Sequence, residues 1–246
     1  MNPTLPEGHR LHVFAEPIEL MEGAAEAMID SLGGLRRAPR VVLAGGRTPL
    51  NLYGALSSPA FQSRLDWERV RFTFSDERGV PPDHEESNYG MVRAALLQPL
   101  KIPEDHVVRM RGEDPPEAAA EKAHHALQGW TQQVPLFDLV LLGLGEDGHV
   151  ASLFPAESWP DFGTRLVAAT RHPSGQDRIT LTPAALRAAD RTFFLVSGAR
   201  KAEAVRDTLT AAEASPRTPA RLAVGKEAVW FLDREAAALL PPQWVE

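Results

Sequence analysis

The sequence predicts an α/β protein with an open, mostly parallel sheet and helices on both faces. Two observations predict this class. Short apolar runs alternate along the chain with segments in which apolar residues recur at helical spacing. The runs at 41–43 and 139–142 are wholly apolar and lead into glycines, which is typical of parallel strands buried on both faces. The 21 prolines cluster between these segments as turns, so we expect one domain spanning residues 1–246.

The first half of the chain shows this alternation. Residues 16–32 carry apolar side chains at helical spacing, from Ile18 to Leu32, and predict an amphipathic helix. The strand at 41–43 enters a glycine turn, and a helix is expected to begin near Pro49, a residue suited to a first helical turn. A strand at 70–74, a helix at 87–97, a strand at 106–110 and a helix at 116–132 repeat the pattern.

The second half continues the alternation. Strands are expected at 137–142, 191–196 and 229–232, with helices at 200–212 and 234–240. Residues 217–224 fit neither periodicity and are expected to form an extended loop. The segment 159–175 mixes Gly, Pro and charged residues, and is expected to be a loop that could close over a site.

Composition narrows the function classes. The 246 residues include 26 basic and 33 acidic side chains, giving a formal net charge of −7. The sequence therefore has no excess of positive charge that would attract nucleic acid or an anionic membrane. The absence of cysteine excludes disulfides and thiolate metal sites. The first residues lack a basic segment followed by an apolar run, so we expect a soluble cytoplasmic protein without a membrane partner.

Four places that follow strands carry the residues suited to chemistry, because ligands of parallel sheets bind beyond the carboxyl ends of the strands. The first is the turn Gly45-Gly46-Arg47-Thr48, whose backbone amides could hold a phosphate. The second is Asp76-Glu77-Arg78, which ends an apolar strand with three charges. Each also has a purely structural interpretation, as a tight turn or as a solvated strand end.

The third place is the most informative. The strand at 137–142 runs into Gly143-Leu144-Gly145-Glu146-Asp147-Gly148-His149, which presents an acid and a histidine two residues apart. A histidine titrates near neutral pH and therefore suits a general base, whereas the structural alternative is a histidine hydrogen-bonded within a loop. The fourth place supplies Arg178 and Lys201, cations that can meet a phosphate.

Taken together, the stretches AGGRTP, FSDERGVPPDHEESNYG, DLVLLGLGEDGHVASLFP, RITLT and VSGARKAEAV resemble the 6-phosphogluconolactonase family. The resemblance runs from Val41 to about Leu232, and GEDGHVASLFP is its most specific element. It implies a Rossmann-like open sheet similar to that of glucosamine-6-phosphate deaminase. It also implies hydrolysis of a phosphorylated sugar lactone in the oxidative pentose phosphate pathway.

On this resemblance, His149 is expected to be the general base and then to return the proton to the ring oxygen, with Asp147 orienting it. Arg78 is expected either to neutralise the carbonyl oxygen or to contact the phosphate. Asp76 and Glu77 are expected to hold Arg78 or to bind sugar hydroxyls. The resemblance implies that the phosphate is held by Gly45, Gly46, Arg47 and Thr48 together with Arg178 and Lys201.

Two other functions occur on the same type of fold. A deaminase of the same fold typically has an aromatic residue where this chain has Arg78, and a glutamate-containing segment where this chain reads Ala151-Ser152-Leu153. A non-catalytic sugar-phosphate sensor normally carries a DNA-binding segment, whereas only about 40 residues precede the first expected strand here. His149, Asp76 and Asp147 carry metal-ligating atoms, but no HExxH spacing occurs, so we expect no metal. We also expect no cofactor and a monomer.

Overall fold

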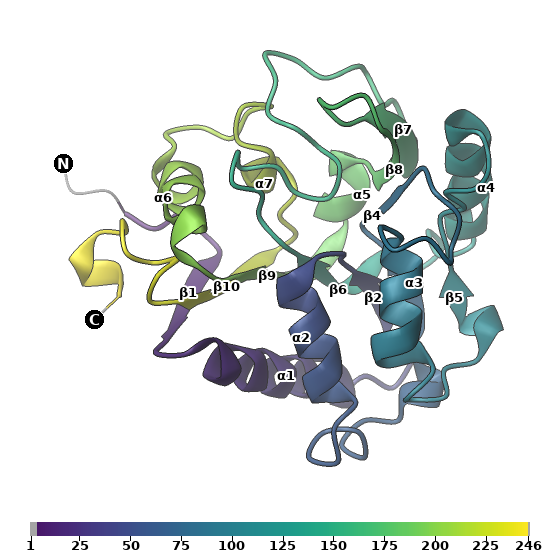
Figure 1. Ribbon diagram of the computed structural model, residues 1–246, viewed down its shortest axis with the longest axis horizontal. Helices are drawn as coiled ribbons and strands as arrows, with labels where there is room; N and C mark the ends of the chain where they lie inside the picture. The colour runs from purple at the N-terminus through teal and green to yellow at the C-terminus, as the bar shows by residue number, and fades with distance from the viewer. Residues whose placement is uncertain (1–3, 246) are drawn as a thin grey trace.

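The fold is built on a seven-stranded sheet in which all neighbouring strands pair in parallel (Figure 1). The computed structural model describes residues 4–245. The strand order is β1-β10-β9-β6-β2-β3-β5. The strands are β1 (His9–Phe14), β2 (Arg40–Leu43), β3 (Arg71–Phe74), β5 (Val107–Val108), β6 (Phe137–Leu142), β9 (Ala189–Val196) and β10 (Glu227–Asp233).

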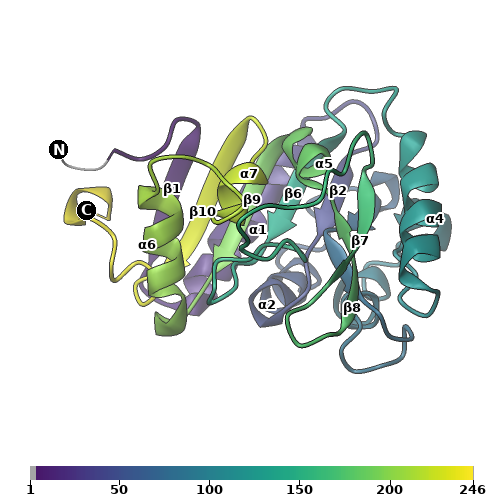
Figure 2. The same ribbon diagram turned by 90° about the horizontal axis from the view of Figure 1, so that it is seen from above.

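Helices cover both faces of this sheet. In Figure 1, α1, α2 and α3 lie below it, whereas α5, α6 and α7 lie above it, and Figure 2 shows the same layers from above. Short 3₁₀ turns occupy Trp67–Arg69, Glu104–His106, Ala199–Lys201 and Pro242–Trp244. The helices are α1 (Pro17–Gly33), α2 (Arg47–Leu56), α3 (Asn88–Val92, continued as a π-helix over Arg93–Leu97), α4 (Pro116–Gln128), α5 (Pro183–Arg187), α6 (Ala202–Thr210) and α7 (Pro219–Leu222).

The sheet separates two apolar cores because successive strand residues point to opposite faces. In β6, for example, Leu139 and Leu141 pack with α1, α2 and α3, whereas Val140 and Leu142 pack with α4, α5, α6 and α7. This double burial explains why the strands read as continuous apolar runs, and the predicted class of fold is confirmed.

A second, antiparallel sheet of three strands, in the order β4-β8-β7, stands beside the main one. Its strands are β4 (Asp76–Arg78), β7 (Val167–Arg171) and β8 (Asp177–Leu181). After β3, Ser75 accepts a backbone hydrogen bond from Leu181, and the chain then leaves the main sheet to pair with β8. The charged residues that follow β3 are therefore strand residues of a separate layer.

Several predicted elements were wrong. Strand β1 precedes the first predicted strand, so far fewer than 40 residues lie before the sheet begins. Residues 217–224 include the short helix α7. The predicted helix at 234–240 is a series of turns, because the Asp233 carboxylate accepts from the Ala236 amide and the chain reaches Pro241 and Pro242. The predicted loop 159–175 contains β7, which pairs with β8.

The order of the strands positions the site. From β2 the chain proceeds to β3 and β5 on one side, and from β6 it proceeds to β9 and β10 on the other. Neighbouring strands β2 and β6 are thus the point where the order reverses, and a crevice opens beyond their carboxyl ends. Within residues 4–245, no helix combines the length and the apolar character needed to cross a bilayer.

Candidate active site

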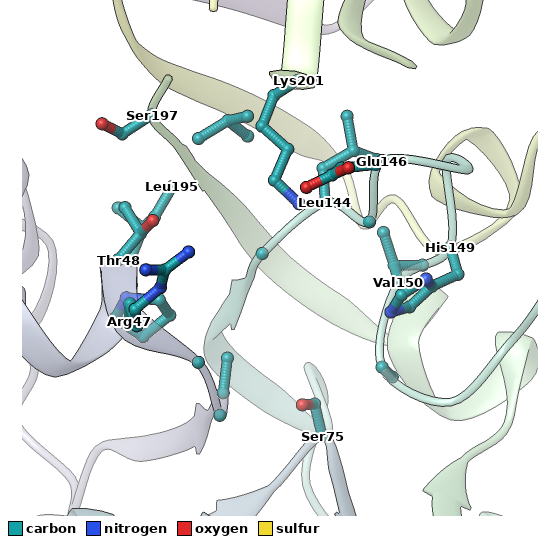
Figure 3. A pocket seen from close by; sticks show the side chains of 18 of the residues that line it. Arg47, Thr48, Ser75, Leu144, Glu146, His149, Val150, Leu195, Ser197 and Lys201 are labelled. Carbon is teal, nitrogen blue, oxygen red and sulfur yellow. The ribbon is translucent and has the colours of Figure 1, made fainter. Parts of the chain in front are cut away.

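A cavity of about 840 Å³ lies beyond the carboxyl ends of the parallel strands. Turns after β2, β3, β6 and β9 line it, together with β8. Figure 3 shows Arg47 at the start of a helix, Lys201 at a helical turn and His149 on a loop, all three beside this one space. All the candidate residues singled out in the sequence line the cavity except Asp147, which contacts His149, and Glu77.

The His149 imidazole is held by Asp147. Its Nδ1 lies 2.6 Å from Asp147 Oδ1, and the same oxygen accepts the His149 backbone N–H at 3.1 Å. Partial burial raises the pKa of Asp147, but the hydrogen bonds and charge of His149 outweigh it, so the pKa is lowered overall. Asp147 therefore remains a carboxylate near neutral pH, and Nε2 of His149 is the ring nitrogen left for a ligand or water.

Glycines make this pair possible. A Cβ on Gly145 would stand 2.1 Å from His149 Nδ1 and 2.4 Å from Asp147 Oδ1, closer than real Cβ atoms approach. Gly148 adopts a φ of +86°, in the left-handed region that favours glycine. The loop after β6 therefore needs both glycines to fold the acid and the histidine onto each other.

Asp76 is buried at the floor of the cavity in a hydrogen-bond network. Its carboxylate accepts from Ser152 Oγ at 2.7 Å and from Ser75 Oγ at 3.0 Å. Asn88 Nδ2 donates to the Asp76 backbone oxygen at 2.9 Å. The network joins β4 to the helix α3 and to the segment after His149. Ser152 and Asn88 were not predicted to be its members.

Glu77 points away from the cavity and caps α3. Its carboxylate accepts the backbone N–H groups of Asn88 and Tyr89, both at 2.8 Å, and the Ser87 hydroxyl at 3.1 Å. Burial raises the pKa of Glu77, and the backbone hydrogen bonds oppose that rise. Glu77 contacts Arg78 through the Arg78 backbone N–H, at 2.7 Å, so the expectation that it holds the guanidinium or binds sugar is wrong.

Arg78 and Arg178 form one of two cationic groups in the cavity. They are register partners across β4 and β8, although they lie 100 residues apart in the sequence. Arg178 is 9% exposed, and its Nη1 is buried without a hydrogen-bond partner among the described residues. Burial and then the charge of Arg78 lower the pKa of Arg178. Two adjacent guanidiniums that line a cavity, one of them incompletely bonded, favour binding of an anion or a developing negative charge.

Arg47 and Lys201 form the second cationic group. Arg47 starts α2 after Gly46, whose φ is +100°. Burial lowers the pKa of Lys201, Glu146 opposes this shift, and the charge of Arg47 adds to it. Lys201 and the glycine turn thus line the same cavity, whereas Arg178 pairs with Arg78 across β4 and β8.

Two helix N-termini face the cavity, and they differ in what occupies their amides. At the turn after β9, Asp233 accepts the Gly198 N–H at 2.9 Å and Glu235 accepts the Ala199 N–H at 3.2 Å. The first turn of α2 has no acidic residue and no side-chain cap. Its amides, with the hydroxyl of Thr48, are thus available to an anionic ligand.

Gly45 is constrained by a close approach. A Cβ there would stand 1.9 Å from Asn88 Oδ1, a buried oxygen without a partner among residues 4–245. The glycine turn after β2 therefore packs directly on the network that holds Asp76.

Two aromatic residues that line the cavity, Phe154 and His172, were not predicted from the sequence. The Phe154 ring lies between two imidazoles, with its centroid 5.0 Å from that of His149 and 5.0 Å from that of His172. Phe154 belongs to the GEDGHVASLFP stretch, so its place near His149 was open to prediction. His172 carries no local signal, because the antiparallel pairing of β7 with β8 brings it to the cavity.

Residues 15–231 match the family model described as glucosamine-6-phosphate isomerases/6-phosphogluconolactonase. The chain belongs to this family. Among curated members, the 6-phosphogluconolactonase of Treponema pallidum is 36% identical over 94% of this chain and 92% of its own. That of Synechocystis is 39% identical over 82% of this chain and 85% of its own.

The chain is also similar to solved structures over nearly its whole length. The crystal structure of devB protein superposes with a TM-score of 0.84, at 33% identity over 95% of this chain and all of the other. The 6-phosphogluconolactonase of Trypanosoma brucei gives 0.81 at 28% identity, over 97% of this chain and 100% of the other. A monomeric glucosamine-6-phosphate deaminase gives 0.80 at 21% identity, over 94% of this chain and 99% of the other, which shows a shared fold.

Proposed function

We propose that this chain hydrolyses 6-phospho-D-glucono-1,5-lactone to 6-phospho-D-gluconate, as an enzyme of the oxidative pentose phosphate pathway. The observation that carries the proposal is the 2.6 Å pair of Asp147 and His149 beside a cavity with two cationic groups. The names of the 6-phosphogluconolactonases to which the chain is similar support the substrate.

Lactone hydrolysis needs an activated water, stabilisation of the oxyanion and a proton for the departing ring oxygen. His149 Nε2 takes a proton from water as the oxygen attacks the carbonyl carbon, and Asp147 stabilises the imidazolium. When the tetrahedral intermediate collapses, the bond from the carbonyl carbon to the ring oxygen breaks. The imidazolium then gives its proton to that oxygen, so His149 returns to its starting state.

The two cationic groups suggest how the substrate lies. The phosphate binds at the open amides of α2 with Arg47 and Lys201, because the amides after β9 already bond to carboxylates. Since Arg178 pairs with Arg78, we assign both to the carbonyl oxygen, where their charge stabilises the oxyanion. This differs from the expectation from the sequence, which grouped Arg178 with Lys201 at the phosphate.

The deaminase remains the alternative from the same family. Within the site, Ser152 Oγ donates to Asp76 at 2.7 Å, so the segment after His149 contributes a hydroxyl rather than a carboxylate to the cavity. A relay that opens an amino sugar needs that second acid. The arrangement therefore favours the lactonase.

Hydrolysis of freshly generated lactone, corrected for the spontaneous rate, tests the proposal, with glucosamine 6-phosphate assayed in parallel. We expect rapid loss of the lactone and no ammonia from the amino sugar. Ammonia release would favour the deaminase, and binding of 6-phosphogluconate without turnover of either compound would favour a sensor.

We also propose that the enzyme is metal-independent, cytoplasmic and monomeric. His149, Asp147 and the arginines supply each function that the reaction requires, so we expect turnover to be insensitive to chelator. We expect light scattering to give the mass of a single chain, 26.9 kDa. Phosphorylated sugars are retained inside cells, which supports the cytoplasm.

A further inference from the structure

His172 is a second histidine of the cavity to which the mechanism above assigns no role. It follows β7 at the start of the turn that leads into β8, and it is partly buried. Its backbone N–H donates to Gln176 at 2.8 Å, and its backbone oxygen accepts from Gly175 at 2.7 Å. The turn is therefore closed by its own hydrogen bonds, which fixes the ring at the edge of the cavity.

The hydrogen bonds of the ring decide which nitrogen carries the proton. Nδ1 accepts the backbone N–H of Ser174 at 3.0 Å and lies 2.7 Å from the Ser174 hydroxyl. Because a backbone N–H can only donate, Nδ1 is unprotonated, and the neutral ring carries its proton on Nε2. Nε2 has no hydrogen-bond partner within residues 4–245.

The neighbours of His172 are those of an anion site. Partial burial and then the charge of Arg178 lower the pKa of His172, with smaller effects in the same direction from His149 and Arg78, while Asp147 opposes them. The ring packs edge-on against Phe154, at an interplanar angle of 85°. His172 lines the same cavity as the two arginines, and Thr170, two residues before it, is the register partner of Arg178.

We propose that His172 is a substrate-contacting residue whose Nε2–H donates a hydrogen bond to the C1 oxygens held by Arg78 and Arg178. The inference rests on the proposed function, because it assigns the C1 end of the sugar to this pair. It makes His172 a determinant of specificity for a C1 carbonyl or carboxylate.

Two substitutions separate this role from a role in the turn. In His172→Asn, the amide oxygen replaces Nδ1 as acceptor for Ser174, but the Nε2 donor is lost. In His172→Gln, the amide nitrogen replaces Nε2 as donor, but the acceptor for Ser174 is lost. His84→Asn is the matched control, because His84 Nδ1 accepts the Glu86 N–H at 3.1 Å in the same kind of turn, outside the cavity lining.

The dissociation constants of 6-phosphogluconate and glucose 6-phosphate, measured by calorimetry, test the inference without relying on turnover. For His172→Asn we expect about tenfold weaker binding of 6-phosphogluconate, the usual effect of losing a hydrogen bond to a charged group. Binding of glucose 6-phosphate, which lacks the carboxylate, should change less than twofold. In His172→Asn, the KM for the lactone should rise by about the same factor as the dissociation constant of 6-phosphogluconate. His172→Gln should bind 6-phosphogluconate nearly as tightly as the wild type.

The opposite pattern overturns the inference. If His172→Gln weakens binding and His172→Asn does not, the residue serves only the turn. Equal losses for both ligands would place His172 at the phosphate and would equally contradict the assignment. Failure of the wild-type protein to hydrolyse the lactone would instead refute the proposed function, and the two binding constants would still report on His172.

Discussion

Replacement of Asp147 by asparagine should lower kcat about 100-fold. In the wild type, Asp147 Oδ1 lies 2.6 Å from His149 Nδ1, and the two side chains are 52% and 33% exposed. A close charge pair of this kind contributes from about 1 kcal/mol in a water-like medium to about 4 kcal/mol near a protein surface. The intermediate exposure places the loss between these limits, which corresponds to about 5- to 1000-fold in rate.

A second effect acts in the same direction. The asparagine amide can donate to Nδ1, which would leave the ring proton on Nε2, where the base must accept one. Initial rates of lactone loss, followed by released acid and corrected for spontaneous hydrolysis, measure the change. The control is Glu121→Gln, which removes a comparable contact, 2.8 Å from His125 Nε2, on the surface of α4. A folded Asp147→Asn protein with a kcat within threefold of the wild type would show that Asp147 does not support His149 in catalysis.

Two further predictions concern stability. Burial lowers the pKa of His9 to about 4, with Nδ1 accepting from Trp230 Nε1 at 3.1 Å. Because the unfolded chain takes up the proton near pH 6.5, the free energy of unfolding should fall by roughly 1–3 kcal/mol between pH 6.5 and 4, allowing for partial exposure. His9→Asn keeps a hydrogen-bond acceptor that cannot be protonated, so it should remove this fall. Urea melts measure the change, and an unchanged pH dependence in the variant would contradict the assignment to His9. Gly45→Ala should lower the free energy of unfolding by about 1–3 kcal/mol, because the new Cβ would stand 1.9 Å from Asn88 Oδ1. Gly54→Ala should raise the free energy of unfolding by about 0.5–1 kcal/mol, because Gly54 lies inside α2 with open space around its Cβ position. Equal melting temperatures for these two variants would refute the packing argument.

The central strands could be predicted because burial on both faces leaves a continuous apolar run. The predicted strand 137–142 coincides with β6. The edge strand β1 was missed, since its side chains are half-buried or exposed and include His9, Arg10 and His12. Edge and turn elements depend on pairing partners far along the chain, which local periodicity does not report.

In the candidate site, too, features with a local sequence signal could be predicted, whereas features that depend on distant pairing could not. The glycines around Asp147 and His149 carry a local signal, so the pair could be anticipated from spacing. The pairing of Arg78 with Arg178 could not, because it depends on the antiparallel register of β4 and β8. Glu77 was misassigned because a charged residue after a strand gives no sign of whether it faces a ligand or the amides of the next helix.

The most direct test of the central claim compares kcat/KM of the wild type and His149→Ala on freshly generated 6-phosphoglucono-δ-lactone, in the presence of a chelator. The account predicts rapid hydrolysis by the wild type and a decrease of at least about 100-fold in the variant, the usual effect of removing a general base. Undiminished turnover by a folded His149→Ala protein would contradict the account, because no other group in it activates the water.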